Sequence, residues 1–105
     1  MSDRAAARTA PAAQVPFRVL VVDDDPDMAG ILARLLGQQG MTAEIAADGH
    51  VALARIAAST PDLVLLDVQM PGPDGFEICR RLKGNEATAL LPVVLVTALE
   101  DHDSR

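Results

Sequence analysis

The chain is poor in residues on which several other classes of protein depend. Its 105 residues include no tryptophan, no tyrosine and one cysteine, Cys79, so an internal disulfide is excluded and a reducing compartment is favoured. No apolar run approaches the roughly 20 residues that a membrane span needs, so we expect a cytoplasmic protein without a membrane anchor. The formal net charge of −6 leaves few cationic side chains for phosphates, so we expect no direct nucleic-acid binding by this segment.

Residues 1–15 lack the apolar segment of a secretory signal. They are rich in alanine, with Arg4, Arg8 and Pro11, and they resemble a transit peptide only in having arginine, serine and threonine with little acid. Their composition favours the simpler interpretation, a disordered leader. Residues 16–105 are then expected to form one domain, because about half of the chain's residues are hydrophobic, which is enough for a single core.

Three apolar runs rich in valine and leucine dominate the rest of the chain. They are Val19–Val22, Leu63–Leu66 and Val93–Val96. Such runs are typical of strands that are buried on both faces of a parallel sheet. In an open α/β sheet, ligands bind beyond the carboxyl ends of the strands. The side chains that follow the runs should therefore meet at one edge and form an acidic, cation-binding pocket. They are Asp23, Asp24, Asp67 and Thr97.

The spacing of apolar residues predicts strands and helices in alternation. The expected strands cover residues 17–22, 41–46, 62–67 and 92–97. Helices are expected at Pro26 after an Asp25 cap, around residues 51–57 after an Asp48-Gly49 turn, and after an Asp74 cap. Gly37 or Gly40 is expected to end the first helix. This alternation predicts an α/β fold, with a doubly wound parallel sheet and helices on both faces.

Three segments of the chain resemble the receiver domain of two-component response regulators. They are Val19–Pro26, Asp62–Gly75 and Pro92–Ala98, and the resemblance extends from Phe17 to the end of the chain. It implies a flavodoxin-like sheet with strand order 2-1-3-4, which has four of the family's five strands. The family's lysine-proline pair and aromatic readout residue belong to the fifth strand. We therefore expect a fragment of a longer reading frame, with a natural mini-receiver as the alternative, and we expect that by itself it binds Mg²⁺ weakly and is poorly phosphorylated.

The resemblance also implies a metal site. Asp24 and Asp67 would bind Mg²⁺ (or Mn²⁺) directly, Asp23 would reach it through water, and the backbone carbonyl of Gln69 would complete the protein ligands. Chemistry independent of the resemblance supports this, because Mg²⁺ prefers oxygen ligands and is usually held by one or two carboxylates. The simpler alternative is a solvated strand exit. Asp25 alone satisfies the capping need, however, and two further adjacent charges are then unexplained without a cation.

The second implication of the resemblance is that the chain carries a phosphoacceptor. Asp67 would take a phosphoryl group from a sensor histidine kinase or phosphotransfer protein, Thr97 would move its hydroxyl to the new phosphate, and Ala98 would keep the entrance open. Phosphoryl transfer asks the protein mainly for positioning and charge stabilisation. An output domain C-terminal to the receiver would be switched, and homodimerisation is left open. Without that context, Asp67 could be an ordinary loop cap and Thr97 an ordinary strand residue.

Two other functions stay open beside this signalling domain, which we do not expect to be an enzyme. Aspartate-nucleophile phosphatases generally carry an Asp-x-Asp motif after the strand that bears the nucleophile. The corresponding residues here, Asp67-Val68-Gln69, lack the second aspartate. A phosphorylation-independent interaction domain would keep the pocket without turnover. Several other residues are expected to have no part in either chemistry, as helix-start, loop, core or solvent-facing residues. They are Asp27, Gly72, Asp74, Gly75, Cys79, Lys83, His50 and His102.

Overall fold

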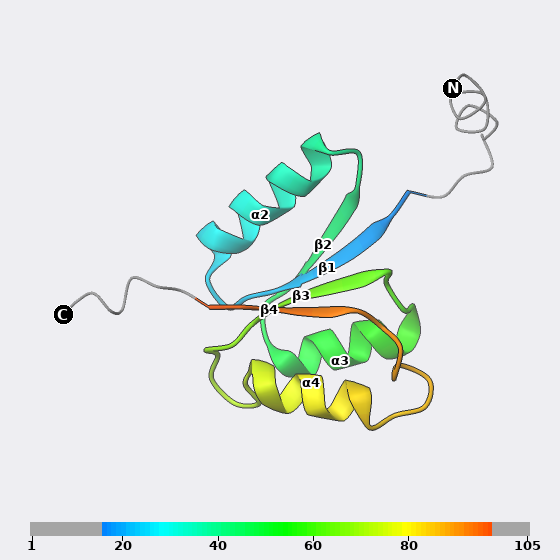
Figure 1. Ribbon diagram of the computed structural model, residues 1–105. Helices are drawn as coiled ribbons and strands as arrows, with labels where there is room; N and C mark the ends of the chain where they lie inside the picture. The colour runs from blue at the N-terminus through cyan, green and yellow to red at the C-terminus, as the bar shows by residue number, and fades with distance from the viewer. Residues whose placement is uncertain (1–15, 98–105) are drawn as a thin grey trace, which may run out of the picture.

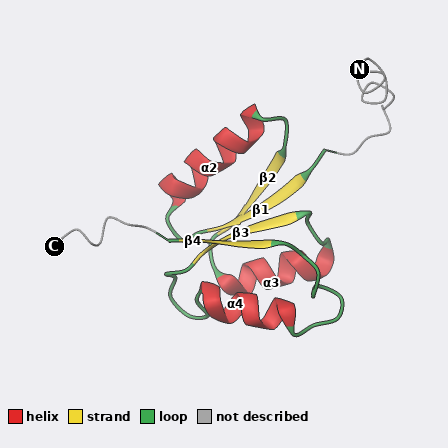
Figure 2. Ribbon diagram, viewed as in Figure 1, coloured by secondary structure: helices red, strands yellow, loops and turns green. Residues whose placement is uncertain are grey.

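The computed structural model describes residues 16–97, which form a four-stranded parallel sheet with helices on both faces (Figure 1). Strands and helices alternate along the chain (Figure 2). They are β1 (Arg18–Val22), α2 (Pro26–Gln38), β2 (Thr42–Ala46), α3 (Gly49–Ala58), β3 (Leu63–Asp67), α4 (Gly75–Lys83) and β4 (Val93–Val96). Each predicted strand boundary is within one residue of the observed one. The predicted leader, Ala98 and His102 lie outside the described residues.

The strand order is β2-β1-β3-β4 with every pair parallel, which confirms the predicted topology. The register places Val22 of β1 opposite Leu66 of β3, and Asp67 opposite Val96 of β4. The chain therefore leaves these three strands at the same level. This register is what brings the residues after each strand to a common edge.

Aspartate caps begin all three helices in the described part of the chain. The Asp25 carboxylate accepts from the Asp27 N–H at 3.0 Å, Asp48 accepts from the Val51 N–H at 2.9 Å, and Asp74 accepts from the Glu77 N–H at 3.0 Å. Each cap of this kind stabilises a helix by about 1 kcal/mol.

The caps at Asp25 and Asp74 confirm the predicted helix starts, but the prediction of a turn at Asp48-Gly49 is wrong. Gly49 is already the first residue of α3, because Asp48 supplies the cap that its helix needs. Gly40, with φ of +87°, follows the end of α2 as one of the two predicted stops.

Two apolar clusters fill the two faces of the sheet. The larger cluster lies under α3 and α4 and includes Leu20, Leu66, Ile56 and Ile78. The smaller cluster lies under α2 and is formed by Val19, Val21 and Ala29, with partly buried side chains around it. Figure 1 shows α2 on one side of the sheet and α3 and α4 together on the other. The doubly wound arrangement is therefore confirmed.

The expectation that each apolar run is buried on both faces holds for β1 and is wrong for β4. Val93 and Leu95 pack against the larger cluster, whereas Val94 points to the other face and is 47% exposed. The reason is that α2 packs over β1 and β2, and no other helix of residues 16–97 covers that face. Within the same residues, no helix is long and apolar enough to cross a membrane.

Candidate functional site

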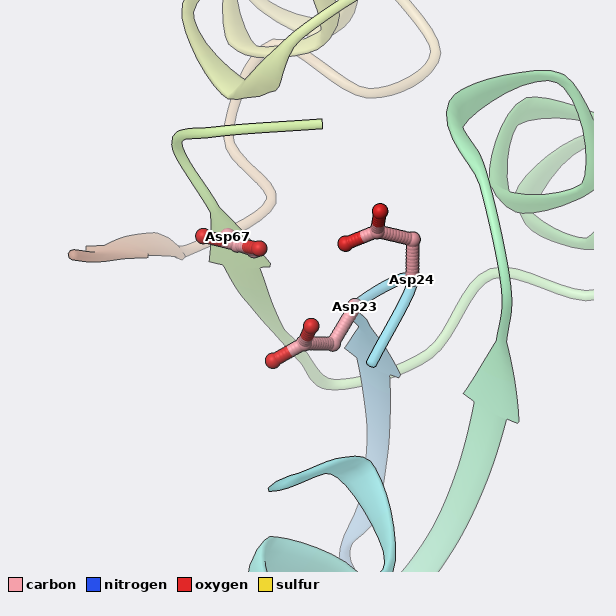
Figure 3. Close-up of side chains that lie close together, drawn as sticks. All are labelled: Asp23, Asp24 and Asp67. Carbon is pink, nitrogen blue, oxygen red and sulfur yellow. The ribbon is translucent and has the colours of Figure 1, made fainter. Parts of the chain in front are cut away.

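Three carboxylates meet at the carboxyl end of the sheet. Asp23 and Asp24 follow β1, Asp67 ends β3, and each contributes one oxygen that lies within 4.8 Å of the other two (Figure 3). Asp67 lies 43 or more positions from Asp23 and Asp24 in the sequence, so the parallel pairing of β1 with β3 brings it to them. The predicted convergence of the strand ends is therefore observed.

Backbone hydrogen bonds hold the two carboxylates closest to the sheet. Asp23 continues the β1 ladder by donating its N–H to the Ala46 carbonyl at 3.1 Å, and its Oδ1 accepts from the Asp25 N–H at 2.9 Å. On the neighbouring strand, Asp67 Oδ1 accepts from the Gln69 N–H at 3.1 Å. Both carboxylates are thus oriented by the chain that follows them, before any ligand is considered.

The three carboxylates differ in exposure. Asp23 is buried, with 7% of its surface exposed, whereas Asp67 is half-buried and Asp24 is exposed. Burial raises the pKa of the Asp23 carboxyl, the hydrogen bond from Asp25 opposes that rise, and the negative charges of Asp67 and Asp24 add to it. Crowding of like charges therefore costs free energy, which a bound cation would recover.

The donor set fits Mg²⁺ in chemistry and in reach. Mg²⁺ takes oxygen ligands at about 2.1 Å in octahedral geometry, so two ligand oxygens lie about 3.0 Å apart when adjacent and about 4.2 Å apart when opposite. Carboxylate oxygens that already lie within 4.8 Å of one another need only small side-chain rotations to reach those separations. Asp24 has the exposure to make such a rotation without loss of packing.

A cavity of about 240 Å³ opens above the carboxylates. Its volume is several times the roughly 30 Å³ that one water occupies in the liquid, so it has room for a partly hydrated cation and a phosphoryl group. Besides the acidic residues, four side chains line it. They are Met28, Gln69, Val96 and Thr97.

Gln69 and Thr97 therefore lie where the sequence predicts them, and Ala98 falls outside the described residues. Met28 and Val96 were not predicted. Met28 lies in the first turn of α2, and its N–H is 3.5 Å from Asp25 Oδ1, so the capped helix start carries its side chain to the cavity. In the sequence, the feature that could have indicated this is the position of Met28, three residues after the Asp25 cap.

Several residues expected to have no part in the chemistry lie away from the cavity. The Lys83 ammonium donates to the carbonyls of Leu91 at 2.7 Å and Ala89 at 3.3 Å, just before the start of β4 and thus at the opposite end of the sheet. Cys79 is only half-buried but packs against the larger core cluster, and His50 is exposed. Gly72 has a φ of +74°, which confirms it as a loop residue chosen for its backbone conformation.

Comparison with known proteins agrees with this fold and site. Residues 19–105 match the response regulator receiver domain family, so the chain belongs to that family. It is 46% identical over 88 residues to Response regulator PleD of Caulobacter vibrioides, covering 84% of this chain and 19% of that protein. It is 44% identical over 81 residues to Transcriptional regulatory protein TcrA of Mycobacterium tuberculosis, covering 77% and 31%. The chain thus spans only about a fifth to a third of the length of these relatives.

Solved structures give the same result. The N-terminal domain of a response regulator receiver protein from Methanoculleus marisnigri matches with a TM-score of 0.75 and 38% identity, over 77% of this chain and 66% of that one. The beryllofluoride-activated receiver domain of Klebsiella pneumoniae RstA matches with a TM-score of 0.71 and 39% identity, over 78% and 68%. The acidic cluster is typical of the magnesium site of receiver domains, which act in two-component signalling with histidine kinases.

Proposed function

We propose that this domain accepts a phosphoryl group on Asp67 from a sensor histidine kinase or a phosphotransfer protein, with Mg²⁺ bound beside it. The metal would be held directly by Asp24, Asp67 and the Gln69 carbonyl, and through water by Asp23. The observation that carries this proposal is the meeting of three carboxylates from two strands within 4.8 Å, at the edge where α/β sheets bind ligands.

Among the three carboxylates, Asp67 suits the acceptor role best. Asp23 is buried, so it has little access to an incoming donor. Asp67 is half-buried and pairs with Val96 in the sheet, which places Thr97, the next residue of that neighbouring strand, close to it. An acceptor beside a hydroxyl that can respond to it is what a phosphorylation switch requires.

The chain's residues would position the reaction and respond to it. The Gln69 N–H orients the Asp67 carboxylate, and the capped start of α2 supports the wall of the cavity. Bound Mg²⁺ would supply positive charge that offsets the repulsion between the carboxylate and the phosphoryl oxygens. Thr97 would then move its hydroxyl to the phosphate, and Ala98 would leave the entrance open for it. That movement would switch an output domain C-terminal to the receiver, or a partner, which includes a second copy of the domain.

Phosphorylation of the full-length natural protein tests the assignment. Labelling with radioactive acetyl phosphate in Mg²⁺ should give an acid-stable, base-labile aspartyl phosphate in the wild type and none in Asp67→Asn. Asp27→Asn is the matched control, since Asp27 is an exposed aspartate at the start of α2 outside the cavity. Equal labelling of Asp67→Asn and the wild type would refute the acceptor assignment.

Two further measurements separate this function from the alternatives. Beryllofluoride should shift the amide resonances of Asp67 and Thr97 in a phosphoacceptor, and it should leave them unchanged in a domain that acts without phosphorylation. Turnover of a generic phosphoester such as p-nitrophenyl phosphate would instead indicate a phosphatase. We expect the shift and no turnover.

A further inference from the structure

Gly75, the first residue of α4, packs directly against the peptide that follows Asp67. It is buried, and a Cβ built on it would lie 2.5 Å from the Asp67 carbonyl oxygen and 2.8 Å from the Cα of Val68. Contacts below 3.0 Å are essentially never made by real Cβ atoms. Its φ is not positive, so the position requires a missing side chain and not an unusual backbone conformation. The expectation that Gly75 is a loop-conformation residue is therefore wrong.

We propose that Gly75 is a positioning residue for the phosphoacceptor, acting through the Asp67–Val68 peptide. This inference rests on the proposed function. By letting the backbone of α4 touch the end of β3, Gly75 sets where that peptide lies, and with it the Asp67 carboxylate and the Gln69 backbone.

Hydrogen bonds hold this peptide and the peptide that follows it. The Val68 N–H donates to the Val96 carbonyl at 2.9 Å, which ties it to the neighbouring strand β4. The Val68 carbonyl accepts from the Gly75 N–H at 3.1 Å, which closes the loop of residues 69–74 at its base. One residue further, the Gln69 N–H donates to Asp67 Oδ1. A shift of the Val68 peptide therefore moves the acceptor carboxylate and its backbone partner together.

The size of the required shift is set by the contact distance. To bring a methyl group at position 75 from 2.5 Å to the 3.0 Å limit, the Asp67 carbonyl and Gly75 must separate by at least 0.5 Å. Productive geometry tolerates only about 0.5 Å, and a misplacement of about 1 Å costs about a hundredfold in rate. We therefore expect Gly75→Ala to slow phosphorylation of Asp67 at least about tenfold and to weaken Mg²⁺ binding, since Mg²⁺ demands near-ideal geometry.

Gly49 offers a control, because it is a second buried glycine at the start of a helix where an added Cβ would be crowded. A Cβ there would lie 2.7 Å from Cδ1 of Ile78 and 3.0 Å from the Pro73 carbonyl oxygen, and no atom of Asp67 or Val68 is among its nearest neighbours. The closer of the two contacts is with the end of a flexible side chain. Gly49→Ala should therefore lower stability while leaving phosphorylation and Mg²⁺ affinity of the folded protein within about twofold of wild type.

The experiment compares Gly75→Ala and Gly49→Ala in the full-length natural protein. Both are also made in a Gly30→Ala background, because Gly30 is an exposed residue inside α2 with open space around it, where alanine stabilises the helix. Urea unfolding gives the folded fraction, acetyl phosphate labelling gives the rate per folded molecule, and Mg²⁺ titration followed by the Asp67 and Gln69 amide resonances gives the affinity.

The expected result is a labelling rate at least tenfold lower and a weaker Mg²⁺ affinity for folded Gly75→Ala alone. Wild-type labelling and affinity in folded Gly75→Ala would overturn the inference. Equal losses in Gly49→Ala, or a Gly75→Ala that does not fold even in the Gly30→Ala background, would overturn it in favour of a purely structural role. If the wild type itself is not labelled, the proposed function fails, and the comparison of Mg²⁺ affinities still decides the role of Gly75.

Discussion

Neutralising Asp24 should stabilise the metal-free protein. Within residues 16–97 no hydrogen bond or ion pair holds the Asp24 carboxylate, and its oxygen lies within 4.8 Å of oxygens of Asp23 and Asp67. Two unit charges 4.8 Å apart repel by about 0.9 kcal/mol in water and by about 3.5 kcal/mol at an effective dielectric constant of 20. Because Asp24 is exposed, the lower value is the better guide. We expect Asp24→Asn to gain about 1 kcal/mol in the free energy of unfolding.

A gain of that size is measurable. For a domain of this length, about 1 kcal/mol raises the melting temperature by about 4–8 °C. Far-ultraviolet circular dichroism is the suitable probe because the chain has no tryptophan or tyrosine. Thermal and urea unfolding are compared in a chelator and in excess Mg²⁺. Mg²⁺ at a hundred times its dissociation constant would stabilise the wild type by about 2.7 kcal/mol, and it should stabilise Asp24→Asn much less.

Asp27→Asn is the matched control for charge. It removes the same unit of negative charge from the first turn of α2, where the helix dipole favours an acid and where the residue is outside the acidic cluster. It should lower stability by about 0.3–1 kcal/mol and leave the effect of Mg²⁺ unchanged. The charge-crowding argument fails if Asp24→Asn is less stable than the wild type in chelator, or if Mg²⁺ stabilises both proteins equally.

Two further predictions concern Asp23 and Lys83. The folded protein holds the Asp23 proton to higher pH than the unfolded chain, so metal-free stability should fall as pH rises from 3.8 through the raised pKa. Asp23→Asn should remove that fall. Urea unfolding in chelator at a series of pH values checks this, through the difference in the free energy of unfolding between wild type and variant. A difference that does not change with pH would contradict the raised pKa of Asp23. Lys83→Met removes the ammonium that bonds the Leu91 and Ala89 carbonyls. It should cost about 1–3 kcal/mol of stability with Mg²⁺ affinity unchanged, and weakened Mg²⁺ binding in calorimetry would show instead that Lys83 acts on the site.

Much of the site could be predicted because its positions depend on local signals and one general rule. Apolar runs locate β1 and β3, and the rule for parallel sheets then places Asp23 and Asp67 at one edge. The caps at Asp25 and Asp74 could be predicted for a similar reason, since an aspartate just before a helix bonds the N–H groups of its own first turn. Each of these predictions needs only local patterns in the sequence and the general rule for parallel sheets.

Apart from the Asp48-Gly49 turn, which is part of a helix start, the wrong or missing predictions concern how whole elements pack against one another. The exposure of Val94 depends on which strands α2 covers, and the apolar run that contains it carries no such information. The contact of Gly75 with the Asp67 carbonyl depends on how closely α4 approaches β3. Met28 lines the cavity only because the capped start of α2 lies next to the acidic cluster.

The order of amino acids alone determined the alternation of strands and helices, the capped helix starts, and which acids follow which strand, because hydrophobic periodicity and capping act over a few residues. Tertiary structure decided how close those acids come, how far burial raises the pKa of Asp23, and which backbone atoms touch the acceptor peptide. Such quantities depend on ångström-scale distances across the sheet, where packing of whole elements, and not local preference, sets the geometry.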